Sequence, residues 1–202
     1  MKSTVGLTQR IDLITGRAEY RDALDQRLTE WVRHAGFFPV AVPNTLMSDD
    51  YKSAATLEAW VEKLQLKALI LTGGNDIFQY PSRDATERSL LSWAQKSRIP
   101  VLGICRGMQM MGVWAGGSLK RVRGHVSTRH VLKGGVNGEV NSYHDFSLVG
   151  CPPEYEVLAR SEDGEIEAIR HKHLPWEGWM WHPEREENIH PRDMQRIKEM
   201  FA

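Results

Sequence analysis

The sequence predicts an α/β protein with a mainly parallel central sheet, and three observations support this fold class. Short apolar runs alternate with amphipathic stretches at helical spacing through the first half of the chain. One run, residues 68–71, is wholly apolar and ends at Gly73-Gly74, which is typical of a parallel strand buried on both faces. Connections between the runs are short, and no repeat or linker interrupts the 202 residues, so we expect one domain over residues 1–202.

The elements of the first half follow from local patterns. We expect strands at residues 5–7, 37–42, 68–71 and 100–103, and helices over residues 18–35, 57–64, 84–94 and 108–114. The first helix is inferred from apolar residues at helical spacing that end at Gly36, and Asp84 is expected to cap the third helix.

The second half is less regular. Glycines cluster over residues 134–138, and polar and apolar residues alternate over 165–169, which favours antiparallel strands at one side of the sheet. One more strand is expected at residues 179–181, and Pro191 opens a last helix.

Composition narrows the class of function. Lysine plus arginine (26) equals aspartate plus glutamate (26), so the chain lacks the electrostatic footprint of a general nucleic-acid binder. No stretch approaches the roughly 20 apolar residues of a membrane helix, and the N-terminal residues do not form a signal peptide. Two cysteines cannot form a disulfide framework. We expect a cytoplasmic protein that handles small molecules, with no nucleic-acid or membrane partner.

The first functional candidate is a cysteine between two glycines. Residues 103–107 read Gly-Ile-Cys-Arg-Gly between an expected strand and an expected helix. A nucleophile on such a tight turn needs small residues two positions before and after it. The helix dipole would stabilise a Cys105 thiolate, and the Arg106 N–H becomes available to an oxyanion. We therefore expect Cys105 to be the nucleophile, whereas Cys151 lies in no such turn and is expected to be structural.

His182 is the expected base for this nucleophile. It follows the apolar run 179–181, and in an extended chain Glu184 faces the same side two residues later. The carboxylate of Glu184 can then fix the tautomer of the imidazole and support the imidazolium, while Pro183 stiffens the step between them.

Four other histidines fall in two pairs, His125 with His130 and His171 with His173. Neither pair lies beside a cysteine pair or within a His-Glu helix motif. We expect solvated surface histidines in both pairs, with His125 or His130 able to reach a substrate, and no metal. The sequence contains no Walker motif and no Gly-x-Gly-x-x-Gly fingerprint, so no organic cofactor is expected.

Four motifs together resemble the class I glutamine amidotransferase superfamily. The cysteine turn continues as Met-Gln, and residues 181–184 read Trp-His-Pro-Glu. Residues 71–76 resemble the oxyanion loop of the superfamily, and residues 140–144 resemble its substrate-binding strand. The matches keep the order of the family over nearly the whole chain. The resemblance implies a flavodoxin-like fold, with a mostly parallel central sheet, helices on both faces and extra antiparallel strands.

Carried over by position, the resemblance implies a triad of Cys105, His182 and Glu184, with the backbone N–H groups of Gly74 and Arg106 as oxyanion hole. The implied γ-glutamyl binding residues are Gln109, Asn141, Ser142, Tyr143 and His144. The implied reaction is attack on a γ-glutamyl amide, release of the amine, and hydrolysis of a γ-glutamyl thioester by water.

Within the superfamily, Cys-Arg-Gly resembles the γ-glutamyl hydrolase branch, because amidotransferases more often carry an aliphatic residue in place of Arg106. The short chain and both its ends resemble γ-glutamyl-CDP-amidate hydrolases of capsular phosphoramidate biosynthesis. A nucleotide leaving group needs contacts to positively charged side chains. Arg121, Arg123 and Arg129, with His125 and His130, could form a basic cluster that makes these contacts. The alternative is that these residues belong to a solvated loop. Asp145 departs from the family pattern, in which a second polar amide or histidine is common.

Three alternatives remain. A glutaminase subunit would supply ammonia to a partner synthase, since this chain has no acceptor domain. A cysteine hydrolase of α/β-hydrolase type would place its acid far before its histidine, whereas His182 and Glu184 share one motif. A catalytically inactive regulatory protein would be expected to lose a triad residue, and all three are present. A stand-alone hydrolase with a small-molecule γ-glutamyl substrate is the preferred interpretation.

Overall fold

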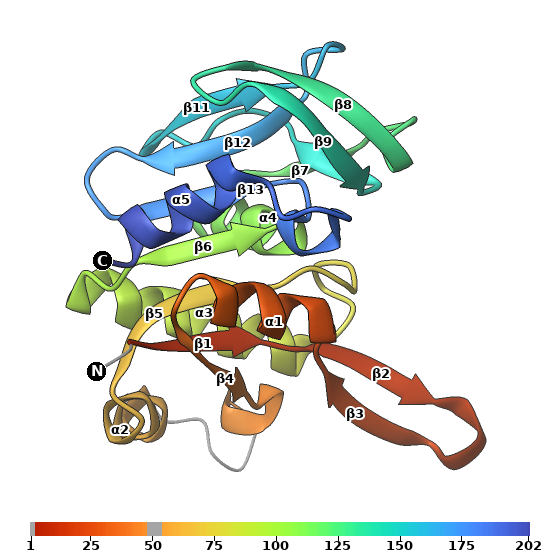
Figure 1. Cartoon of the computed structure of the whole chain (residues 1–202). Helices are drawn as coiled ribbons and strands as arrows, with labels where there is room; N and C mark the ends of the chain where they lie inside the picture. The colour runs from red at the N-terminus through yellow and green to blue at the C-terminus, as the bar shows by residue number, and fades with distance from the viewer. Residues whose placement is uncertain (1–2, 48–53) are drawn as a thin grey trace.

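The computed structural model describes residues 3–47 and 54–202, and its centre is a nine-stranded sheet with helices on both faces (Figure 1). The strands are β1 (Thr4–Thr8), β2 (Arg10–Ile14), β3 (Glu19–Ala23), β4 (Phe38–Val42), β5 (Leu66–Leu71), β6 (Val101–Ile104), β7 (Leu119–Arg121), β8 (Val126–Gly134), β9 (Gly138–Tyr143), β10 (Phe146–Leu148), β11 (Tyr155–Arg160), β12 (Ile166–His171) and β13 (Trp176–Trp179). The helices are α1 (Gln26–His34), α2 (Ala54–Lys63), α3 (Pro81–Ser97), α4 (Arg106–Trp114) and α5 (Pro191–Met200). In the part of the chain described, none of these helices is long and apolar enough to cross a membrane.

The central sheet has the strand order β4-β1-β5-β6-β13-β12-β11-β8-β9. The first five strands of this order run parallel, and counted along the chain their order is 2-1-3-4-5, the flavodoxin-like arrangement. From β12 outward, the strands pair antiparallel. The predicted fold class, including the antiparallel strands at one side of the sheet, is confirmed.

Both faces of the parallel half are covered, which explains its continuous apolar strands. In β5, Ala68 and Ile70 belong to the core that includes residues of α1 and α5, while Leu69 and Leu71 belong to the core that includes residues of α2, α3 and α4. Figure 1 shows α1 and α5 on the near side of the sheet. Successive side chains of one strand therefore enter different hydrophobic layers, and neither set can be polar.

The expected helix over residues 18–35 is wrong in its first part. Residues 19–23 form β3, which pairs with β2 in a hairpin that projects from the body of the protein (Figure 1). Tyr20, which fits the apolar stripe of a helix, is 66% exposed. The helix begins at Gln26 because the Asp25 carboxylate accepts a hydrogen bond from the Arg27 N–H at 3.0 Å and caps it.

Several other boundaries differ from expectation by a few residues, as two examples show. Helix α3 begins at Pro81, so Asp84 lies in its first turn, where the Asp84 carboxylate accepts a hydrogen bond from the Phe78 N–H at 2.8 Å. Strand β13 ends at Trp179, two residues before the expected end, although Met180 and Trp181 are fully buried. Apolar patterns located these segments, but hydrogen bonds to particular partners set their limits.

The cysteine turn is a site of close backbone approach. Cys105 has φ of 52°, a conformation that residues other than glycine rarely adopt. A Cβ atom on Gly107 would lie 2.0 Å from the backbone oxygen of Leu71, and one on Gly103 would lie 2.6 Å from the backbone nitrogen of Met108. Glycine two positions either side of the cysteine is therefore required sterically, as the sequence pattern predicts.

Gly107→Ala should lower the free energy of unfolding by about 1–3 kcal/mol, because the added Cβ is forced against the Leu71 carbonyl. The better helix propensity of alanine, about 1 kcal/mol, acts in the opposite direction and is too small to compensate. Gly150→Ala is the control, since no atom lies within 4 Å of its added Cβ. Urea unfolding measures both variants, and equal stability would contradict the close approach.

Candidate active site

The structure brings Cys105 and His182 to the same edge of the sheet. Cys105 directly follows β6, and its N–H donates a hydrogen bond to the Trp179 carbonyl of the parallel neighbour β13 at 2.7 Å. His182 follows β13 three residues later. A Cβ atom on Gly73, after β5, would lie 2.6 Å from His182 Cε1 and 3.6 Å from Cys105 Cβ. Both side chains therefore meet at the loop that follows β5.

His182 is buried and bonded to Glu184. Its Nδ1 lies 2.7 Å from Glu184 Oε1, and their side chains are 2% and 4% exposed. Burial lowers the pKa of His182, but the charge of Glu184 and the hydrogen-bonded Cys105 thiol outweigh this and raise the pKa to about 9. At neutral pH the imidazole accordingly holds two protons, one toward Glu184 and one on the side of Cys105.

Buried charged residues of α3 form ion pairs with Arg106, the residue after the nucleophile. The guanidinium of Arg106 donates to both Asp84 and Glu87, and Arg83 Nε donates to Glu87 at 3.1 Å. Burial raises the pKa of Glu87, but Arg106 and Arg83 more than offset this and hold that pKa below its usual value. We call these four residues, Arg83, Asp84, Glu87 and Arg106, the α3 network. It turns the side chain of Arg106 into the protein interior, where that side chain is 2% exposed.

The same network holds the loop after β5. Arg83 donates hydrogen bonds to the Thr72 carbonyl at 2.7 Å and to the Gly73 carbonyl at 3.1 Å, and it also bonds the Gly74 carbonyl. Gly74 has φ of +82°, which favours glycine. The two residues predicted to form the oxyanion hole, Gly74 and Arg106, are thus tied to one set of side chains.

Asn141 is placed against the backbone of His182. Its Oδ1 accepts a hydrogen bond from the His182 N–H at 2.9 Å, and its Nδ2 donates to the His182 carbonyl at 2.8 Å and to Glu186 at 2.8 Å. Tyr143 is 42% exposed, and its ring lies edge-on to His182 at 5.9 Å. Of the predicted γ-glutamyl binding residues, Tyr143 is the most accessible.

The other three predicted binding residues are buried and bonded to protein groups. Gln109 donates to the Phe146 carbonyl at 2.9 Å, and Ser142 donates to the His125 carbonyl at 2.7 Å. His144 Nδ1 lies 3.0 Å from the same Phe146 carbonyl. Direct contact of these side chains with a substrate stays a prediction.

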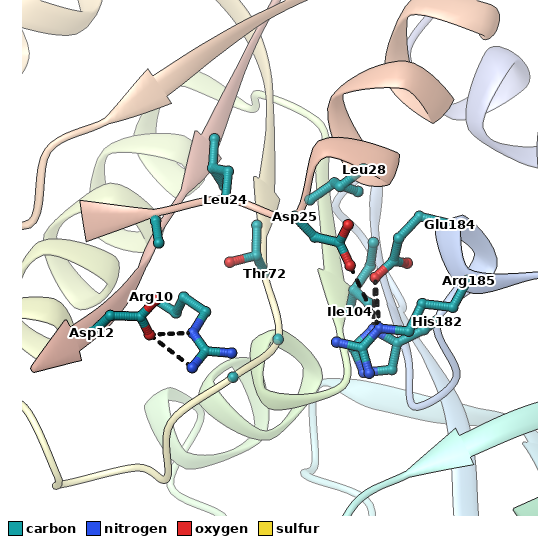
Figure 2. Close-up of a pocket in the computed structure, with 13 residues that line it drawn as sticks. Arg10, Asp12, Leu24, Asp25, Leu28, Thr72, Ile104, His182, Glu184 and Arg185 are labelled. Atoms are coloured by element: carbon teal, nitrogen blue, oxygen red, sulfur yellow. Dashed lines mark hydrogen bonds and ion pairs between the residues drawn. The ribbon is translucent and has the colours of Figure 1, made fainter. Parts of the chain in front are cut away.

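A cavity of about 290 Å³ opens beside His182 (Figure 2). Arg10 and Asp12 of β2 form one wall, and His182 and Glu184 lie opposite with Arg185. Its lining residues are Arg10, Asp12, Ala23, Leu24, Asp25, Leu28, Thr72, Gly73, Gly74, Ile104, His182, Glu184 and Arg185. The cavity lies at the carboxyl ends of β1 and β5. Between these two strands the strand order reverses, and open α/β sheets bind ligands at such a topological switch point.

The expectation of solvated histidines is wrong for His171, which is buried, and for His125. The side chain of His125 is 1% exposed and lies 2.8 Å from Asp163. Arg129, on the same strand region, pairs with Glu139 at 3.3 Å and with Glu186 at 3.2 Å. The basic cluster around residues 121–130 therefore does not form one free cationic surface.

Comparison with known proteins decides the family. The model of the family "Glutamine amidotransferase class-I" matches residues 19–200. The chain belongs to this family. A crystal structure assigned to the GMP synthase of Thermoplasma acidophilum superposes with a TM-score of 0.73 at 20% identity, covering 100% of this chain and 95% of the other. At that identity the superposition establishes the fold alone.

Two curated relatives of this amidotransferase-family chain carry different activities. The γ-glutamyl-CDP-amidate hydrolase of Campylobacter jejuni is 32% identical over 143 residues, or 68% of this chain and 70% of the relative. A glutamine-hydrolysing GMP synthase component of Methanothrix thermoacetophila is 38% identical over 137 residues, or 63% of this chain and 72% of the relative. A hydrolase acting on γ-glutamyl amides fits the family and both relatives.

Sequence reasoning missed the α3 network, Gly73 and the cavity wall of β2. The one available signal was the spacing of Arg83 and Glu87, four residues apart on one helix face. Their burial could not be read from it, because such pairs are usually solvated.

Arg83→Met should lower the free energy of unfolding by about 3–5 kcal/mol, because it leaves the Glu87 carboxylate buried with fewer partners. Lys96→Met on the same helix is the matched control, since Lys96 is exposed and the change should stay within about 0.5 kcal/mol. Urea unfolding compares the two variants. A loss of similar size in both would show that the α3 network contributes nothing particular to stability.

Proposed function

We propose that this chain is a hydrolase that cleaves γ-glutamyl amides through Cys105, His182 and Glu184, within one catalytic domain. The observation that supports it best is the 2.7 Å contact between His182 Nδ1 and Glu184 Oε1, with Cys105 on the other side of the imidazole. A nucleophile, a base and an orienting carboxylate in this order form the functional unit of covalent acyl transfer.

In the first half of the reaction, the Cys105 thiolate attacks the γ-carbonyl carbon. The carbonyl π-electrons move to oxygen, and the tetrahedral intermediate then expels the amine as the carbon–nitrogen bond breaks. His182 gives its proton to the departing nitrogen, which leaves a γ-glutamyl thioester on Cys105. Glu184 holds the imidazole in the required tautomer and balances the charge of the imidazolium.

In the second half, neutral His182 takes a proton from water while the water oxygen attacks the thioester carbon. The carbon–sulfur bond breaks, glutamate leaves, and the thiolate and imidazolium are restored. In both halves, the N–H groups of Gly74 and Arg106 would donate to the oxyanion. Arg106 is the first residue of α4, and the first N–H groups of a helix have no intrahelical acceptor.

For the substrate we propose γ-glutamyl-CDP-amidate, hydrolysed to glutamate and CDP-amidate by a chain that acts alone. The similarity to the Campylobacter jejuni hydrolase favours this substrate. The cavity beside His182 carries two arginines, Arg10 and Arg185, of the kind that contact diphosphates. Under this proposal the protein acts in capsular phosphoramidate synthesis, in the cytoplasm.

The second candidate is the glutaminase subunit of an amidotransferase. The similarity to a glutamine-hydrolysing GMP synthase favours it. Here the leaving amine is ammonia, and a partner synthase would consume it. The triad chemistry is the same in both candidates, so the leaving group and the need for a partner distinguish them.

Glutamate release by the purified chain tests both candidates. We expect turnover of γ-glutamyl-CDP-amidate with little glutaminase activity, and Cys105→Ala should reduce this turnover at least about 10³-fold without unfolding the protein. Cys151→Ala is the matched control and should keep its activity, because Cys151 lies between β10 and β11 and packs against the core that includes residues of α2, α3 and α4. Efficient glutamine hydrolysis, or activity only with a synthase, would favour the amidotransferase. Near wild-type activity of Cys105→Ala would refute the mechanism.

The pH profile tests the roles of His182 and Glu184. The pKa of His182 is raised to about 9, so its proton is available to the leaving nitrogen below that pH and lost above it. We expect kcat/KM to fall as the pH rises through about 9. Glu184→Gln removes the charge that raises this pKa, so its alkaline limb should move to lower pH. An unchanged alkaline limb in Glu184→Gln would argue against this pairing.

A further inference from the structure

A group of four ligand-type side chains, three buried and one half-buried, lies outside the triad, between the β8–β9 hairpin and β12 (Figure 1). They are His125, His130, His144 and Glu167, and one nitrogen or oxygen from each lies within 4.8 Å of the others. The residues come from three separate strand regions, so the fold, not local spacing, assembles them. We call them the histidine cluster.

The second nitrogen of two of these imidazoles is already engaged. His144 Nδ1 lies 3.0 Å from the Phe146 carbonyl, and His125 Nε2 lies 2.8 Å from the Asp163 carboxylate. Both partners only accept hydrogen bonds, so these two nitrogens carry the protons. In the neutral imidazoles, His144 Nε2 and His125 Nδ1 then present lone pairs to the centre of the cluster. This arrangement is the one that orients histidine ligands of metals.

The buried carboxylate at the centre of the cluster would be stabilised by a positive charge. Glu167 is 0% exposed, and among the residues described neither of its carboxylate oxygens has a hydrogen-bond partner. His130 Nε2 is also buried without a partner there. A buried carboxylate of this kind is costly unless a cation balances it.

The distances among three of the four residues, His125, His144 and Glu167, fit a tetrahedral metal ion, and His130 completes the group within 4.8 Å. His125 Nδ1 and His144 Nε2 are 3.3 Å apart, and each lies 3.4 Å from Glu167 Oε1. A tetrahedral zinc ion with ligands at about 2.0–2.1 Å requires ligand–ligand separations of about 3.3–3.4 Å. Direct N–H···O hydrogen bonds are usually shorter, near about 2.9–3.0 Å.

We propose that the histidine cluster is a structural zinc site, with His125, His130, His144 and Glu167 as its four ligands. Three imidazoles and one carboxylate suit zinc, and four protein ligands close the site to water. The ion also balances the charges of Glu167 and Asp163. The proposal replaces the sequence-based expectation of no metal, and it stands independently of the catalytic proposal.

The site would fasten the β8–β9 hairpin to β12 and so steady the region around His182. His144 directly follows β9, and Asn141 of the same strand bonds the His182 backbone on both sides. Ser142 bonds the His125 carbonyl at 2.7 Å, which links the two ends of the hairpin. A zinc ion there would stabilise the fold and would take no part in the chemistry.

Zinc binding is best measured in the Cys105→Ala chain, so that the thiol of the triad cannot contribute a ligand. After chelator treatment, the chain should take up one Zn²⁺ per molecule by metal analysis, with a rise in Tm. Co²⁺ in its place should give the intense visible absorption of a tetrahedral ion. Absence of stoichiometric Zn²⁺ uptake, or a weak octahedral Co²⁺ spectrum, would overturn the proposal.

Two variants locate the ion. Glu167→Gln removes a ligand and should weaken Zn²⁺ binding more than about 10-fold. Asp163→Asn changes no ligand but alters the partner of His125, at a side chain that is 56% exposed and also accepts a hydrogen bond from Ser161, and should weaken binding about 10–100-fold. His173→Ala, at an exposed histidine outside the cluster, is the control and should bind like the parent. Equal Zn²⁺ affinity in all of these variants would place any bound metal elsewhere.

Discussion

The buried ion pairs of the α3 network are the constraint on which the candidate site depends. Arg106 begins the helix behind the nucleophile, and Arg83 bonds the carbonyls of the loop after β5. Glu87 joins the two arginines from the centre of α3. Since buried charges are tolerated only with partners in close to ideal geometry, any movement of the loop relative to the cysteine turn would leave a charge uncompensated. Electrostatics therefore make the loop and the turn one rigid unit.

This rigidity complements the strain at Cys105. A residue other than glycine at φ of 52° persists only where the surrounding structure determines it strongly. Here the Trp179 carbonyl accepts a hydrogen bond from the Cys105 N–H, Gly107 allows α4 to approach β5, and Gly103 allows it to approach β6. The same packing leaves space for His182 only because residue 73 lacks a side chain. The site is thus preorganised by its hydrogen bonds and also by the absence of Cβ atoms at Gly73, Gly103 and Gly107.

Local patterns in the sequence predicted the parallel strands, the cysteine turn and the proximity of His182 to Glu184, because each depends on residues a few positions apart. Strand β3 was predicted as helix, since Tyr20 and Leu24 fit a helical stripe while Asp25 sets the true helix start. The α3 network and the histidine cluster could not be predicted, because their members are polar and because Arg106 and Glu167 are distant in sequence from their partners. Burial of polar residues is decided by tertiary pairing, which periodicity does not encode.

The hairpin of β2 and β3 stands apart from the central sheet and from the segments that hold the triad. It reaches them through Asn75, whose side chain bonds both backbone groups of Ile11 at 2.8 and 3.0 Å. Arg10 and Asp12 therefore lie on an element that shares no ladder of backbone hydrogen bonds with the strands before Cys105 and His182. The charge of this cavity wall can change without altering those strands, so under the proposed function the choice of ligand and the bond cleavage depend on separate elements of the fold.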